Sequence, residues 1–197
     1  MRNDELAIID LETTGTNPHL HDVLSLAVVP FDNAEPLQLH VQCQGGKWSP
    51  FAEKNFEKFS EQWRQQAVAP AEACQHLEDY LRDTFQDSQV TIVGHNIGFD
   101  VAFLRRLAYL GGREDICGFS HRTVDTHTML FVLNQLDIIP ASALGSDGAF
   151  EYFDITVPED DRHTALGDAR ATRDLYAALM EIFSNLKEGK QYRGLAL

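Results

Sequence analysis

The fold is decided by the stretch Ala7-Ile8-Ile9-Asp10-Leu11-Glu12-Thr13-Thr14-Gly15, residues 7–15. Its apolar, β-branched start predicts a buried strand, and the glycine predicts a turn after it. Because side chains along a strand alternate between its two faces, Asp10 and Glu12 project to one face and Leu11 to the other. Acids at a strand end are commonly solvated, but beside a buried strand their charge must be offset, and a bound cation would do this.

A second block, residues 90–104, reads VTIVGHNIGFDVAFL and combines an apolar strand, a polar turn and the start of a helix. Apolar Val101, Leu104 and Ala108 recur at helical spacing, which places Asp100 in the first turn of that helix. A carboxylate in this position is favoured by the helix dipole, so the position alone does not require a catalytic role.

A third block, residues 163–172, reads HTALGDARAT and opens a long helical pattern. Asp168 lies on the predicted helix, and His163 lies at its start or in the loop before it. A single histidine in such a place is usually a surface residue. Histidine is also the side chain that accepts a proton from water most readily near neutral pH, so His163 is a candidate general base.

Together the three blocks resemble the Exo I, Exo II and Exo III motifs of the DEDDh family of 3′-to-5′ exonucleases. That family includes the proofreading exonuclease subunit of DNA polymerase III, ribonuclease T and oligoribonuclease. The patterns D-x-E-T-T-G, H-N-x-x-F-D-x-x-F-L and H-x-A-x-x-D-A-R-A-T occur in the family's order, and the histidine of the third selects the histidine branch. The chain departs from the family in its second strand, residues 23–29, which lacks the usual glutamate and glycine.

The resemblance implies a reaction and a set of residues that perform it. The reaction is hydrolysis of the 3′-terminal phosphodiester of single-stranded or frayed DNA or RNA, which releases nucleoside 5′-monophosphates. The cofactor is a pair of Mg²⁺ ions, for which Mn²⁺ is a substitute, and His163 deprotonates the attacking water. The metal ligands are Asp10, Glu12, Asp100 and Asp168. The resemblance also implies contacts of Thr13, Thr14 and Asn96 with the terminal nucleotide. Phe99, beside Asp100, and Leu11, between the two acids, are expected to meet the terminal base, because end-recognising nucleases often stack bases on side chains.

The hydrophobic pattern along the whole chain predicts an α/β protein with an RNase H-like layout, and the resemblance implies the same fold. The first three strands have short connections and favour an antiparallel meander, and the later strands alternate with helices and should add in parallel. The result is a mixed five-stranded sheet flanked by helices. We expect one exonuclease domain over residues 1–197, with a short tail at 187–197. The strands are predicted near 6–12, 23–31, 36–43, 89–94 and 121–125, and the helices near 70–86, 99–111, 126–136 and 163–186.

The net charge of −14, from 16 basic and 30 acidic residues, is unusual for a protein that grips long duplexes. Two divalent ions would cancel four of these charges, and a few terminal nucleotides need few phosphate contacts. The acidity therefore favours short or single-stranded ends. Five arginines flank the second and third blocks, and Arg162 is the best candidate among them for a phosphate contact; the five are Arg105, Arg106, Arg162, Arg170 and Arg173.

The three cysteines, Cys43, Cys74 and Cys117, are odd in number and widely spaced, which argues against a disulfide framework and a thiolate zinc site. Reduced thiols in a cytoplasmic protein are the simplest account of them. No apolar stretch is long enough to cross a membrane, and residues 1–5 do not begin an apolar signal region. We expect a cytoplasmic protein without a membrane partner.

Two other functions remain open. The first is a catalytically silent subunit that binds nucleic acid or a partner, although all five chemical positions are intact. The second is an RNase H-like nuclease that cuts internally, although the histidine-containing third motif belongs to enzymes that trim ends. Asp125 is interpreted as a helix cap rather than a fifth metal ligand. The sequence does not decide between DNA and RNA as the substrate. It also does not decide whether the protein forms a homodimer or binds a polymerase partner.

Overall fold

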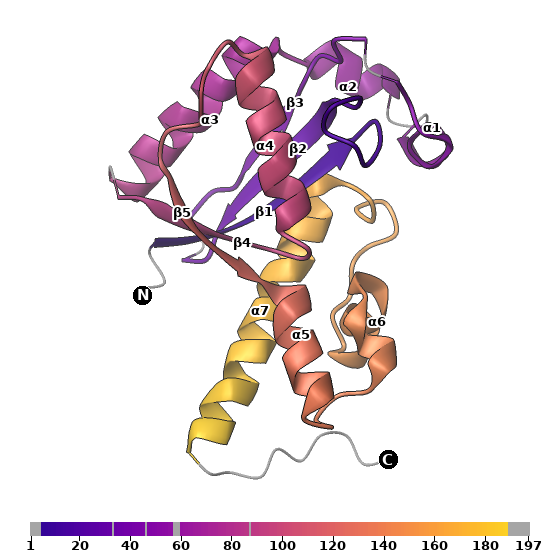
Figure 1. Ribbon diagram of the computed structural model, residues 1–197, viewed down its shortest axis with the longest axis vertical. Coiled ribbons are helices and arrows are strands. Elements are labelled where there is room, and N and C mark those ends of the chain that lie inside the picture. Colours follow the sequence, from indigo (N-terminus) through magenta and orange to yellow (C-terminus); the bar gives the residue numbers. More distant parts are fainter. Residues whose placement is uncertain (1–4, 33, 46, 57–59, 87, 189–197) are drawn as a thin grey trace.

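The computed structural model describes residues 5–32, 34–45, 47–56, 60–86 and 88–188. At its centre is a five-stranded sheet with the order β3-β2-β1-β4-β5 (Figure 1). β1 pairs antiparallel with β2, which pairs antiparallel with β3, whereas β4 joins β1 in parallel and β5 joins β4 in parallel. The predicted mixed sheet is therefore confirmed. Its strands are β1 (Leu6–Thr13), β2 (Val23–Pro30), β3 (Leu37–His40), β4 (Val90–Gly94) and β5 (Phe119–Asp125).

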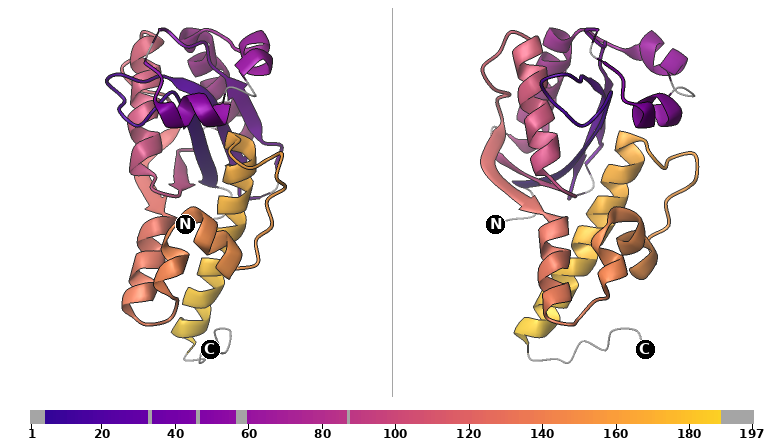
Figure 2. Two further views of the ribbon diagram at one scale, coloured as in Figure 1. Left: turned by 90° about the vertical axis from the view of Figure 1, so that its right-hand side faces the viewer. Right: turned by 45° about the vertical axis from the view of Figure 1, so that its right-hand side comes forward.

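Helices cover both faces of the sheet (Figure 2). On one face, α3 (Pro70–Phe85) and α4 (Gly98–Leu110) bury a core that includes Ile9, Leu11 and Leu26 of the two central strands. On the other face, α7 (Ala165–Lys187) packs through Ala165 and Ala169 against Ile8. This alternation follows from the two-residue period of β1, and it directs the even-numbered residues of β1 toward α7.

A smaller group of helices extends the molecule below the sheet (Figure 1). α5 (Thr126–Gln135), the 3₁₀ helix η3 (Ala141–Leu144) and α6 (Ser146–Tyr152) pack against the later turns of α7. Their shared core includes Leu130, Phe150 and Leu175. This packing fixes where α6 lies relative to the start of α7.

The four predicted helices are present, with ends within two residues of the prediction. Four shorter elements were not predicted: α1 (Pro50–Phe56), α2 (Ser60–Gln66), η3 and α6. Each has seven residues or fewer, about two helical turns, and so few positions show little hydrophobic periodicity. The tail predicted at 187–197 lies outside the described residues from 189 onward. In the described part of the chain, no helix is long and apolar enough to cross a membrane.

Candidate active site

An acidic cluster forms where β1 meets the first turn of α7. Asp10 and Glu12 project from β1 toward α7, and Asp168 projects back from α7. One carboxylate oxygen from each of the three lies within 4.8 Å of the others. The geometry follows from the strand period, because Asp10 and Glu12 share the face on which Ile8 packs against α7. The cluster thus joins residues that are more than 150 positions apart in the chain.

The fourth predicted ligand, Asp100, approaches from the opposite helix layer. It lies in the first turn of α4 and is 4% exposed. The backbone N–H groups of Asp100 itself and of Leu11 donate hydrogen bonds that lower its pKa, but burial dominates and raises that pKa well above its usual range. Its charge raises the pKa of both Asp10 and Glu12. Asp100 therefore lies close enough to act electrostatically on Asp10 and Glu12, while the group with oxygens within 4.8 Å of one another is Asp10, Glu12 and Asp168.

The electrostatics of the cluster are those that a bound cation would relieve. Burial, reinforced by Asp168 and Asp100, raises the pKa of Glu12 to about 8. Burial and the charges of the other three acids likewise raise the pKa of Asp10 well above its usual range. Buried carboxylates with raised pKa values lack sufficient positive charge around them. Several close carboxylate oxygens are the hard ligands that Mg²⁺ and Mn²⁺ take, so the donor set fits the predicted ions.

Arg162 is the basic residue at this cluster. Its guanidinium donates from Nη1 to Oδ1 of Asp168 and from Nη2 to Oδ1 of Asp147 on α6. It also lies 5.5 Å from the centre of the Phe150 ring. Burial opposes the charge of Arg162, but its pairs with Asp147 and Asp168 outweigh burial and raise its pKa. Arg162 was the best candidate among the arginines of the sequence for a phosphate contact. Asp147, which lies in a helix that was not predicted, was not identified from the sequence.

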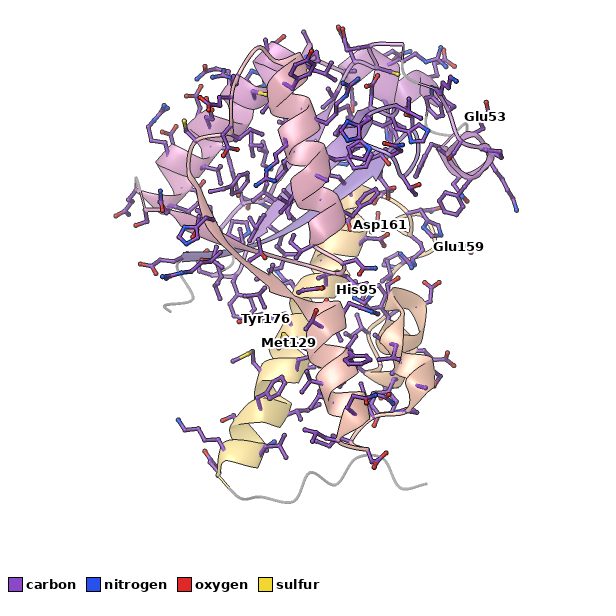
Figure 3. All side chains as sticks on the ribbon, in the orientation of Figure 1. Glu53, His95, Met129, Glu159, Asp161 and Tyr176 are labelled. Atoms are coloured by element: carbon purple, nitrogen blue, oxygen red, sulfur yellow. The ribbon has the colours of Figure 1, made fainter. Side chains whose placement is uncertain are left out.

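His163 lies beside the cluster, in the turn that leads into α7. Burial raises the pKa of Asp168, and the nearby His163, whose backbone N–H donates to Asp168, opposes that rise. The backbone of His163 is left-handed, with φ of 59°. Figure 3 shows the labelled Asp161 and Glu159 on the same segment before α7. All five predicted catalytic positions therefore converge on one place.

The turn that carries His163 is held by two local devices. Thr164 caps α7, because its hydroxyl accepts from the N–H of Gly167 and donates to the carbonyl of Asp161. Gly167 has no side chain where the turn passes, and an added Cβ would lie 2.1 Å from the Asp161 oxygen. Glycine at position 167 is thus required for the turn to lie against α7.

Three of the predicted substrate residues are built into the framework of the site. Leu11 is 5% exposed and packs in the core between the sheet and α3 and α4. Thr13 donates from its hydroxyl to the carbonyl of Gly15 at 2.7 Å. Thr14 accepts at its hydroxyl from the N–H of Asp22 at 3.0 Å. Contacts of these three residues with a nucleotide stay a prediction.

The other two predicted substrate residues are more accessible. Asn96 is exposed, with φ of 63°, and its N–H donates to Asp125 at 2.9 Å. Phe99 is half-buried, and its ring lies 4.8 Å from that of Phe103. Asp125 also accepts from the N–H of His127, which confirms that it caps α5. Asn96 and Phe99 thus lie in the segment that leads into Asp100 at the start of α4.

A polar row crosses the sheet beside the cluster. Glu12 pairs in register with Ser25, and Ser25 pairs with His40. The hydroxyl of Ser25 and Nδ1 of His40 are buried, and neither has a hydrogen-bond partner within the described part of the chain. Burial lowers the pKa of His40. Ser25 lies in the second strand, where the sequence departs from the DEDDh pattern.

Together, the mixed sheet and the carboxylates at its centre define an RNase H-like nuclease. The chain belongs to the exonuclease family RNase T, whose pattern matches residues 7–176. A curated relative, a DNA polymerase III subunit epsilon-like protein of Rhodobacter capsulatus, is 28% identical over 177 residues. The match covers 88% of this chain and 23% of that protein, so the chain spans about a quarter of the relative's length.

Solved exonuclease structures share the fold. E. coli exonuclease I in complex with a dT13 oligonucleotide aligns with a TM-score of 0.73 and 17% identity, over 92% of this chain and 42% of that one. The nuclease domain of 3′hExo, a DEDDh family member bound to rAMP, aligns with a TM-score of 0.72 and 14% identity, over 90% and 92% of the two chains. The predicted RNase H-like fold is thereby confirmed.

Proposed function

We propose that this chain is a metal-dependent 3′-to-5′ exonuclease of the DEDDh branch. It hydrolyses the terminal phosphodiester of single-stranded or frayed DNA or RNA and releases nucleoside 5′-monophosphates. The observation that carries the proposal is the convergence of four carboxylates and His163 from three distant parts of the chain. We infer that residues 1–197 contain one exonuclease domain.

Each residue of the cluster has a role in this proposal. Asp10, Glu12, Asp100 and Asp168 would hold two Mg²⁺ ions, or Mn²⁺ in their place. When bound, such a pair of ions stabilises the attacking and leaving oxygens of an in-line displacement. His163 takes the proton of the attacking water, and the nearby carboxylates stabilise the imidazolium that results. The turn before α7 orients His163 through its backbone bond to Asp168.

A short single-stranded end is the substrate that the charge distribution favours. A net charge of −14 repels long nucleic acids, whereas a terminal segment needs few phosphate contacts. The dT13 bound by E. coli exonuclease I and the rAMP bound by 3′hExo support DNA and RNA equally as candidates. Asn96 and Phe99 are the substrate residues with accessible side chains, and Phe99 offers a ring on which a base can stack.

The test is digestion of matched 5′-labelled single-stranded DNA and RNA with Mg²⁺. We expect stepwise shortening by the wild type, a rate at least about 100-fold lower for His163→Ala, and no change for His76→Ala. His76 is a suitable control because it lies on the surface of α3, beside Glu72. A circular substrate should stay intact, and its cleavage would identify an internal nuclease. Absence of shortening with metal bound would favour a silent binding subunit.

A further inference from the structure

Arg162 connects the acidic cluster to a residue outside it. One end of its guanidinium is paired with Asp168, whose side chain is 15% exposed, and the other with Asp147, whose side chain is 82% exposed. The Phe150 ring, one helical turn from Asp147, lies against the guanidinium. The side chain of Arg162 is itself 20% exposed. Arg162 is thus tethered at the solvent side and paired with a proposed metal ligand at the inner side.

The inner pair and a metal ion would compete for the same carboxylate. The positive charge of Arg162 lowers the pKa of Asp10, Glu12 and Asp168, so Arg162 partly compensates the cluster when no metal is bound. A divalent ion on Asp168 would repel the guanidinium and supply more charge in its place. The tether to Asp147 and the contact with Phe150 do not involve the ion, and they would keep Arg162 beside the site.

We propose that metal binding displaces Arg162 from Asp168 and that the freed side of its guanidinium then binds a phosphate oxygen of the substrate, with Asp147 as the positioning residue. This inference rests on the proposed function, because that function places the scissile phosphate at the carboxylates. The planar guanidinium has several donors that match the oxygens of a carboxylate or a phosphate, so one anion replaces the other without a change of donor. The exchange would bring a positive charge to the substrate only after the metal is in place.

The first experiment measures Mn²⁺ binding by calorimetry without substrate. Arg162→Gln should bind Mn²⁺ about threefold to tenfold more tightly than the wild type, because the competing cation is gone. Asp147→Asn should bind Mn²⁺ more weakly than the wild type does, because the guanidinium of Arg162 then pairs with Asp168 alone. The double variant should match Arg162→Gln, and Arg122→Gln, which removes an exposed charge on β5, should match the wild type. Unchanged affinity in Arg162→Gln, or equal weakening by Asp147→Asn in both backgrounds, would overturn the exchange.

The second experiment measures hydrolysis of a single-stranded oligonucleotide across a salt series. Arg162→Gln should raise KM about tenfold with a smaller change in kcat, and it should reduce the slope of log KM against log salt by about one. Arg162→Lys should keep the wild-type metal affinity, and its KM should lie between those of the wild type and Arg162→Gln. Lysine keeps the positive charge but loses the planar set of N–H donors of the guanidinium. A wild type that does not hydrolyse the substrate would contradict the proposed function and leave the metal result standing. A wild type that does, with an unchanged KM in Arg162→Gln, would contradict the phosphate contact alone.

Discussion

The substitution Glu12→Gln should stabilise the metal-free protein at alkaline pH. Glu12 lies in a cluster with Asp10 and Asp168. Burial, reinforced by the charges of Asp168 and Asp100 and opposed by Arg162, raises the pKa of Glu12 to about 8 from an ordinary value of 4.5. Glutamine has nearly the same shape and carries no charge. The substitution therefore removes the repulsion and leaves the packing of β1 against α7 in place.

The sign and size of the effect follow from proton linkage. The pKa of Glu12 is higher in the folded protein than in the unfolded chain, so folding is progressively destabilised as the pH rises from 4.5 to about 8. The interval between the two pKa values corresponds to at most about 5 kcal/mol, since one pKa unit is about 1.4 kcal/mol. Below pH 4.5 both states are protonated and this contribution vanishes. Glu12→Gln should thus gain little stability at pH 4 and up to about 5 kcal/mol at pH 9.

The measurement is urea unfolding followed by circular dichroism in a metal chelator, from pH 4 to pH 9. Glu151→Gln, at an exposed position on α6, is the matched control and should follow the wild type. With Mg²⁺ in place of the chelator, the wild type should gain stability and Glu12→Gln should gain less, because it lacks one ligand. A gain that is equal at pH 4 and pH 9, or a wild type more stable than Glu12→Gln at pH 9 without metal, would refute the reasoning.

Two further predictions concern the same site. At pH 7, Mn²⁺ binding should release protons, because the pKa of Glu12 lies near 8 and a metal ligand must be deprotonated. Calorimetry in buffers of different ionisation enthalpy measures the number of protons released. A value of zero would contradict the raised pKa of Glu12. Asp125→Asn should lower the free energy of unfolding by about 1 kcal/mol, because it weakens the cap of α5. It should reduce the rate of hydrolysis far less than Asp10→Asn does. Chemical denaturation and the rate on labelled DNA test this, and an equal loss of rate in the two variants would indicate that Asp125 is a metal ligand.

The sequence predicted the sheet because strand pairing follows short-period patterns, whereas the shared site of the acids was implied by the resemblance to the DEDDh motifs. The alternation along β1 placed Asp10 and Glu12 on one face, and α7 covers that face in the structure. The strands pair in the predicted senses, since short connections favour antiparallel neighbours and helical crossovers favour parallel ones. The position of Asp100 in the first turn of α4 followed from helical spacing alone.

The contacts that arise from tertiary packing could not be predicted from the sequence. Asp147 lies on α6, a helix of seven residues that is held in place by packing against α7 rather than by its own periodicity. Nothing in a local window indicates that Asp147 would meet Arg162, fifteen positions later. The burial of Leu11, Thr13 and Thr14 was similarly hidden, because motif resemblance identifies a position without its exposure.

The same arrangement would, under the proposed function, let a strongly acidic protein act on a polyanion. The carboxylates of the cluster are buried, so their ionisation destabilises the metal-free fold, and a bound divalent ion would offset that cost. Arg162 reduces the repulsion among the carboxylates while no ion is bound, and its pair with Asp147 keeps Arg162 beside the cluster. In the proposed exchange, ions that replaced Arg162 at Asp168 would increase the positive charge at the point where a phosphate would lie. Attraction of the substrate would then be a property of the metal-loaded site and not of the surface as a whole.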